Sequence, residues 1–275
     1  MKRTLWVTLF VVALGACDLL GPEDEGKVMI RFRGAASAPA AAQVVAGDPP
    51  VALAQTIVGS NGTLTIQSIH VVVGKFKLEG SEEACPDRPG ERDDDEDEDD
   101  DDDEDELEDC GEFEAAPFLL SLPLDGGTVS VKSSDVPAGT YDELEFEVED
   151  ADMDDDDDEA DALNALRAQM LALHADWPKD ASMVVVGTFT PTGGTARSFR
   201  TFVDAEVEIE LDLSPPLTVD DGGEADITVV LDPSRWFRTR SGTVIDLSAF
   251  NSVSRRLQLE VELEDGFTKV EIERH

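Results

Sequence analysis

The chain has 275 residues, with 63 acidic and 21 basic side chains and a formal net charge of −42 at pH 7. A negative charge of this size repels phosphate backbones and anionic lipid surfaces. It therefore excludes nucleic acid and leaves cations, a basic protein or a glycan as partner classes. Hydrophobic residues make up 41% of the chain, which is enough to build a sizeable core.

The first residues predict export and lipid anchoring. Lys2 and Arg3 precede an uncharged, largely apolar stretch at residues 5–14, and Cys17 directly follows Leu-Gly-Ala. A basic start, a short apolar stretch and small residues are typical of a signal peptide. The stretch is shorter than the roughly 20 apolar residues that span a bilayer. The cysteine after Leu-Gly-Ala resembles the lipobox of bacterial lipoproteins.

The lipobox resemblance implies that residues 1–16 are removed and that Cys17 receives a diacylglyceryl group and palmitate. These chains would anchor the protein to a membrane of the bacterial cell envelope, in a periplasmic or surface-exposed position. Residues 17–25 are then a lipidated polar tether, and residues 26–275 form one domain. The alternative is an ordinary secretory signal in which the cysteine occurs by chance.

Short segments of alternating apolar and polar residues follow the tether, and this period of two predicts strands. The expected strands lie at residues 27–33, 63–78, 117–122, 128–132, 144–148, 183–190, 197–203, 207–213, 226–231, 257–263 and 267–272. Two changes of parity within residues 63–78 indicate a bulge or bend. Asp265-Gly266 lies between the last two alternating segments, which predicts a hairpin.

A single amphipathic helix is expected at about residues 159–175. Leu163, Leu166, Met170 and Leu173 recur there at steps of three and four residues. Alternation with one polar face favours antiparallel pairing in the strand segments. The sequence therefore predicts an all-β fold, an antiparallel β-sandwich with one helix.

A low-complexity acidic insertion occupies residues 91–109. Every residue from 93 to 109 is acidic except Leu107, and residues 154–159 form a second, shorter acidic run. Blocks of like charge repel and stay extended, so we expect a disordered acidic loop at about residues 86–109.

The acidic insertion is the candidate for metal chemistry. Calcium takes six to eight oxygen ligands, and Asp99, Asp101, Asp103, Asp105 and Asp109 supply carboxylates in abundance. The segment lacks the glycine and the spaced glutamate of an EF-hand, so any calcium binding there is expected to be weak. Two hypotheses remain open, a weak calcium site and a solvated polyanionic loop without a specific ligand. No other cofactor is predicted.

Cys85 and Cys110 bracket the acidic insertion. In an oxidising compartment two remaining cysteines most often pair, so we expect a disulfide that closes the acidic segment into a surface loop. Chain entropy gives such a bridge a stabilisation of roughly 3 kcal/mol. The alternative is a pair of free thiols.

Catalytic signatures are missing from the sequence. It contains no zinc-type Cys or His spacing, no nucleophile elbow and no phosphate-binding glycine loop. His70 lies between apolar neighbours on an expected strand, which favours a structural role. Trp177 and Trp236 are expected to be core or edge anchors rather than a platform for carbohydrate.

Several motifs resemble bacterial lipoproteins that carry a β-sandwich domain of unknown function (number 4382). They are the lipobox, the tripeptide Ile69-His70-Val71, the segment DVPAGTYDELEFEVED and the later segment LDPSRWFRTRSGTVIDLSAFN. The resemblance covers roughly residues 27–150 and implies an envelope sandwich without catalytic residues. The acidic insertion departs from the family pattern.

Together these features predict a non-enzymatic, lipid-anchored envelope protein with a β-sandwich binding or structural module. The alternative function is a glycan-directed hydrolase of the envelope that uses two carboxylates, because an acid-rich β protein offers many such pairs.

Overall fold

Strands dominate the described chain, as the period-two alternation predicts. The computed structural model describes residues 25–35, 54–80, 113–151, 160–259, 263 and 265–275. Its helical elements are α1 (Ala160–Leu173) and a short 3-10 helix, η3 (Leu247–Phe250). Its strands are β1 (Glu25–Gly34), β2 (Gln55–Gly59), β3 (Gly62–Gly80), β4 (Phe113–Ala115), β5 (Phe118–Ser121), β6 (Thr128–Pro137), β7 (Gly139–Val148), β8 (Met183–Pro191), β9 (Arg197–Asp204), β10 (Val207–Val219), β11 (Glu224–Leu231), β12 (Leu257–Gln258) and β13 (Phe267–Arg274).

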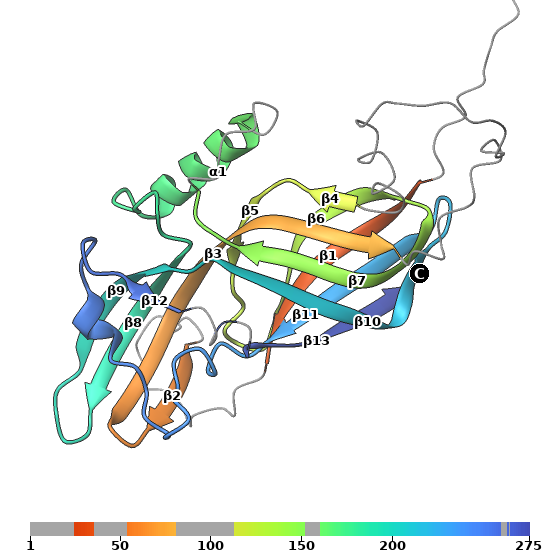
Figure 1. The fold of residues 1–275 in the computed structure, drawn as a ribbon. Coiled ribbons are helices and arrows are strands. Elements are labelled where there is room, and N and C mark those ends of the chain that lie inside the picture. Colours follow the sequence, from red (N-terminus) through yellow and green to blue (C-terminus); the bar gives the residue numbers. More distant parts are fainter. Residues whose placement is uncertain (1–24, 36–53, 81–112, 152–159, 260–262, 264) are drawn as a thin grey trace, which may run out of the picture.

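The strands form two sheets in a sandwich-like arrangement, which confirms the all-β fold class (Figure 1). The smaller sheet has the order β13-β11-β1-β6. The larger sheet follows the path β10-β7-β3-β8-β9-β12, and β2, β4 and β5 also pair with β3. We refer to these as the small sheet and the large sheet.

Strand β3 joins the two halves of the large sheet. Its first half pairs with β8 and its second half with β7, while β2, β5 and β4 occupy its other edge in turn. The pairing register shifts between Ile66 and Ser68 and again between Val73 and Phe76. These shifts are the two parity changes seen in the sequence, and they let β3 keep apolar side chains in the core along its whole length.

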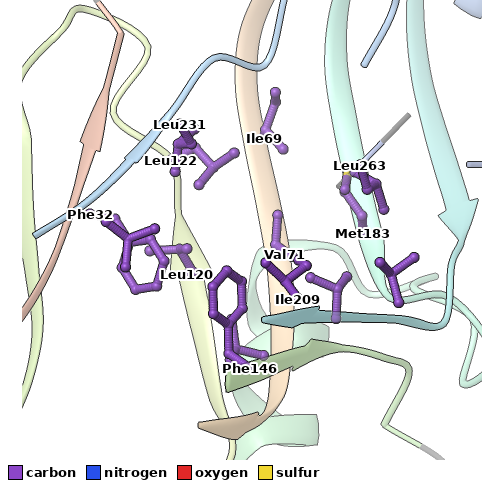
Figure 2. Close-up of a cluster of buried hydrophobic side chains, with 14 of the residues drawn as sticks. Phe32, Ile69, Val71, Leu120, Leu122, Phe146, Met183, Ile209, Leu231 and Leu263 are labelled. Carbon is purple, nitrogen blue, oxygen red and sulfur yellow. The ribbon is translucent and has the colours of Figure 1, made fainter. Parts of the chain in front are cut away.

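The main core lies between the inner faces of the two sheets, and Figure 2 shows part of it. Phe32 of β1 meets Phe146 of β7 edge-on, with ring centroids 6.0 Å apart. Phe146 also contacts Phe267 of β13, with a centroid distance of 4.8 Å. Phe146 therefore packs against two strands of the opposite sheet, and such aromatic pairs add to the stabilisation from burial alone.

Helix α1 covers the outer face of the large sheet and builds a second, smaller core there (Figure 1). Leu166 and Met170 are buried against Val72 of β3 and Phe202 of β9, with Trp177 beside them. The helix begins and ends close to the expected limits, but Leu173 is 46% exposed and does not belong to the buried stripe. Among the described residues, no helix is both long and apolar enough to cross a membrane.

Two pairings depart from the expected antiparallel pattern. Strand β1 lies parallel to β11, with Lys27 opposite Glu224 and Gly34 opposite Leu231. Strand β12 lies parallel to β9. Both pairs join segments that are separated by other strands in the sequence, so no tight turn imposes an antiparallel direction on them.

The predicted hairpin at Asp265-Gly266 is wrong. Strand β13 pairs with β11 in the small sheet, whereas β12 pairs with β9 in the large sheet. The indole of Trp236 lies against Gly266, where an added Cβ would come within 1.7 Å of Nε1. The same Nε1 donates to the Leu263 carbonyl at 3.0 Å, so this buried indole fixes the turn.

Tyr141 closes the connection between β6 and β7. The side chain is 1% exposed, and its hydroxyl donates to the Pro137 carbonyl at 2.8 Å. A tyrosine that bonds back to the backbone a few residues upstream is the tyrosine corner of Greek-key sandwiches. The bond satisfies the Pro137 carbonyl at the turn that residues 137–139 form between β6 and β7.

We expect Tyr141→Phe to lower the free energy of unfolding by about 1–2 kcal/mol, because the ring stays packed while the Pro137 carbonyl loses its donor. Urea denaturation measures this change. Val58→Ala, at a side chain that is 60% exposed, is the control and should stay within about 0.5 kcal/mol of the parent. An unchanged stability of Tyr141→Phe would contradict a structural role for the bond.

Candidate functional site

The outer face of β7 and β10 carries a ladder of acidic side chains. In β7, Leu144, Phe146 and Val148 are buried in the core, so the glutamates between them point to the other face. Strand β10 alternates in the same way from Val207 to Leu213. We call the resulting set the carboxylate face: Glu143, Glu145, Glu147, Glu208, Glu210 and Asp212.

The pairing register places these acids directly opposite one another. Glu147 faces Glu208, Glu145 faces Glu210, and Glu143 faces Asp212 across the β7–β10 ladder. Residues opposite each other in an antiparallel pair have Cβ atoms roughly 5 Å apart, and like charges at that distance are destabilising. Three successive pairs therefore concentrate negative charge along one stripe of the surface.

Strand β3 borders the carboxylate face on the other side and supplies its nearest cations. Lys77 lies opposite Glu145, while Glu79 lies opposite Glu143 and adds another acid. Lys75 of the same strand forms an ion pair with Glu114 of β4, at 3.9 Å. The acids of β7 thus have lysines along one edge, whereas those of β10 lie on the edge strand of the sheet.

Burial makes two carboxylates of β7, Glu143 and Glu145, hold their protons more tightly. Glu145 is 7% exposed, and burial raises its pKa to about 7 even though nearby Lys77 lowers it. The charge of Glu208 and a hydrogen bond with Glu79 also contribute to this raised value. Burial, together with the charges of neighbouring acids, also raises the pKa of Glu143. The carboxyl of Glu145 therefore titrates close to neutral pH, where a small change in its surroundings alters its charge.

Glu149 follows the carboxylate face and lies in its own recess. A Cβ at Gly74 would come within 1.9 Å of the Glu149 carboxylate, so the missing side chain of this glycine makes room for it. Burial, followed by repulsion from Glu147, raises the pKa of Glu149 to about 7. A hollow of about 330 Å³ adjoins this position, lined by Glu147, Val148, Glu149, Glu206, Val207 and Glu208.

The donor set of this surface consists of carboxylate oxygens. Such oxygens suit hard cations such as calcium, which accepts flexible geometry and mixed protein and water ligands. They also share protons when they are forced together. The carboxylate face is therefore equipped to exchange protons for a divalent cation near neutral pH.

The residues singled out in the sequence fall into two groups, those outside the described part of the chain and those within it. Cys17, Cys85 and Cys110 lie outside the described residues, as do Asp99, Asp101, Asp103, Asp105 and Asp109. The lipidation, the disulfide and the calcium site at residues 91–109 therefore stay predictions.

The two tryptophans of the domain are core anchors, as expected. Trp177 and Trp236 are 2% and 0% exposed, and Trp177 donates through Nε1 to the Ala181 carbonyl at 2.7 Å. His70 points away from the main core, where its Nδ1 lies 2.9 Å from the Ser121 hydroxyl and its ring centroid 6.1 Å from that of His174. Burial and the neighbouring imidazole lower the pKa of His70.

The carboxylate face was not predicted as a site, although the alternation of acids in its two strands is visible in the sequence. The segment LEFEVE in β7 and the segment VEIELDL in β10 each show one acidic face. Neither segment alone reveals that the two strands are neighbours, or that their acids are in register.

Comparisons with known proteins give few matches. No family model matches the chain, and the search of curated proteins finds no match. Among solved structures, the chain is similar to MbnP from Methylosinus trichosporium, at 13% sequence identity and a TM-score of 0.38. The match covers 84% of this chain and 83% of that chain. A likeness at this level assigns neither a family nor a function, so the resemblance to envelope lipoproteins stays a prediction.

The raised pKa values predict a specific pH dependence of stability. Between about pH 4.5 and 7, Glu145 and Glu149 hold protons in the folded state that they have already lost in the unfolded chain. Their contribution to stability is therefore full below pH 4.5 and is lost as the pH rises through about 7. We expect the double variant Glu145→Gln/Glu149→Gln to lack this loss, because glutamine imitates the protonated acid.

Urea denaturation of the parent and the double variant between about pH 5 and 8 tests this expectation. The difference between the two proteins is the informative quantity, because burial lowers the pKa of His70 and His174 and so acts in the opposite direction. Parallel stability curves for the two proteins would contradict the raised pKa values.

Proposed function

We propose that the protein is a non-enzymatic, lipid-anchored module of the bacterial cell envelope whose carboxylate face binds calcium. The observation that carries the calcium binding is the register of β7 and β10, which holds three pairs of acids directly opposite each other. An arrangement that is unfavourable for bare charges becomes favourable when a divalent cation lies between them.

The pair formed by Glu147 and Glu208 is the centre of the proposed calcium site. Both residues line the hollow of about 330 Å³, together with Glu149 and Glu206. Four carboxylates provide eight oxygen atoms, which reaches the upper end of the six to eight oxygen ligands that calcium takes. Calcium bound by Glu149 would have to displace the proton that this carboxyl holds near neutral pH.

The expected affinity is low. The acids of β10 are exposed and the hollow is open to solvent, so a bound ion would keep part of its water shell. Sites of this kind in extracellular modules have dissociation constants of about 10⁻⁴–10⁻³ M. Such a site is occupied at millimolar calcium outside the cell and is empty at the micromolar concentrations inside it.

Two acidic runs in the sequence belong to connections that follow β3 and β7, which are strands at the carboxylate face. Residues 93–109 belong to the segment between β3 and β4, and residues 154–159 to the segment between β7 and α1. They would raise the local concentration of cations without forming a fixed site. Deleting residues 93–109 therefore separates their contribution from that of the strands.

We expect Glu147→Gln/Glu208→Gln to weaken calcium binding about tenfold, or about 1.4 kcal/mol, because the variant removes one opposed pair of charges. Calorimetric titration with calcium at physiological salt measures the change. Glu271→Gln is the matched control, since Glu271 lies on the small sheet and forms ion pairs with Arg33 and Lys269.

The deletion of residues 93–109 completes this test. If the strands form the site, the deleted protein still binds calcium and still responds to Glu147→Gln/Glu208→Gln. A protein that loses all calcium heat on deletion, or that binds calcium equally well in the double variant, overturns the proposal.

The lipid anchor is the second part of the proposed function. Its support is the order of basic residues, apolar stretch and Leu-Gly-Ala-Cys at the start of the chain. Each methylene buried in a bilayer contributes about 0.8 kcal/mol, and more than one acyl chain is needed for stable attachment. A triacylated Cys17 meets that requirement, and the polar residues after it would hold the β-sandwich away from the membrane.

We expect Cys17→Ala to move the protein from the membrane fraction to the soluble fraction, because the variant has no thiol to receive the lipid. Fractionation of the expressing bacterium with quantitative blotting measures the distribution. Ser37→Ala, a change downstream of the expected signal, should leave the protein with the membranes. Membrane attachment of Cys17→Ala would show that lipidation at this residue is not the anchor.

A further inference from the structure

A second cluster of metal-binding side chains lies on the outer face of the small sheet, away from the carboxylate face. Strands β11 and β13 are antiparallel neighbours, and their register places Asp226 directly opposite Glu273. His275 follows Glu273 by two residues, so its side chain lies on the same face of the sheet as that of Glu273. Two neighbouring strands thus bring an imidazole and two carboxylates together.

The ligand atoms of these three residues converge. They all lie within 4.8 Å of one another, and His275 Nε2 is 2.9 Å from Asp226 Oδ2. The His275 backbone N–H donates to the Glu224 carbonyl at 3.0 Å, so the strand pairing continues to this residue and fixes its position. The cluster is therefore held by the sheet itself.

Asp226 is built into the sheet as a buried acid. It is 5% exposed, and its Oδ2 also forms an ion pair with Arg31 on the neighbouring strand β1. A carboxylate that binds a metal is commonly oriented by a second hydrogen-bonding group behind it. Arg31 has that position for Asp226, while Glu273 and His275 are exposed and free to adjust.

A hollow of about 410 Å³ lies over this cluster and gives access to it. Asp226, Glu273 and His275 belong to its lining, and Lys27, Met29 and Ser133 come from the other two strands of the small sheet. The space admits an ion with its remaining water ligands.

The chemistry of the donor set points to zinc rather than calcium. Zinc accepts imidazole nitrogen and carboxylate oxygen at 2.0–2.2 Å, whereas calcium prefers oxygen ligands alone. Tetrahedral geometry with such bonds places neighbouring ligand atoms about 3.4 Å apart. The observed separations, 2.9 Å for one pair and at most 4.8 Å for the others, reach that value through small rotations of exposed side chains.

We propose that Asp226, Glu273 and His275 form a zinc-type metal site that is distinct from the calcium-binding carboxylate face. Three protein ligands leave one tetrahedral position for water, which faces the hollow. Metal binding replaces the contact between His275 and Asp226 with a shared ion and joins β13 to β11 more firmly. Arg31 keeps Asp226 in position in both states.

The test is a calorimetric titration of the full-length chain with zinc, after alkylation of its thiols. About 5 mM calcium is present throughout to occupy sites made of oxygen alone. We expect one zinc equivalent whose affinity falls at least about tenfold in His275→Ala and in Glu273→Gln. Both side chains are exposed, so the variants keep the fold, and circular dichroism verifies this.

Two controls locate the site. His174→Ala removes another partly exposed imidazole, and Glu147→Gln/Glu208→Gln removes carboxylates from the other sheet, and both should bind zinc as the parent does. Nitrogen-15 NMR of the histidine rings should show the His275 signal shifting with one equivalent of zinc. Unchanged zinc affinity in both His275→Ala and Glu273→Gln, or an unshifted His275 ring, overturns the proposal.

Discussion

The register between β7 and β10 is the constraint on which the surface of this protein depends. It is set by the core, where Leu144 pairs with Leu211 and Phe146 with Ile209. Shifting the ladder by one residue would move these side chains into solvent, so the strands cannot slide to relieve repulsion on the opposite face. The acids of the carboxylate face are thus held opposite one another by apolar contacts that lie on the other side of the same strands. Charge repulsion is a consequence of the packing, and protons or cations are the means of reducing it.

The small sheet handles its charges differently. On its outer face, basic residues of β1 form ion pairs with acids of β6, β11 and β13: Lys27 with Asp135, Arg31 with Asp226, and Arg33 with Glu271. Charge there is balanced across strands, which is the favourable arrangement for a solvated sheet. An imidazole and two acids are gathered in this balanced setting, whereas the large sheet presents carboxylates with few cations beside them. The two faces therefore suit different metals.

Much of the fold can be predicted from local patterns. Period-two alternation predicted most strands, and the two parity changes in β3 predicted the register shifts between Ile66 and Ser68 and between Val73 and Phe76. The short strands β2 and β4 were missed, because five and three residues carry too little pattern. The prediction of a hairpin at Asp265-Gly266 was wrong because the indole of Trp236, which is distant in the sequence, determines the turn. Both candidate sites depend on which strands are neighbours in the sheet. Asp226 and His275 lie 49 residues apart, so no sequence pattern indicates that they meet.

The central position of β3 has a consequence for how the chain reaches its native state. Gly62 of β3 is opposite Pro191, and Lys27 of β1 is opposite Glu224, so each of these two strands gains one of its neighbours only when most of the chain has been made. Contacts of such long sequence separation slow folding, and unpaired apolar strands are prone to aggregate meanwhile. A net charge of −42 opposes that aggregation, because molecules with the same large charge repel one another. The acidic composition thus protects the incomplete chain as well as serving the finished protein.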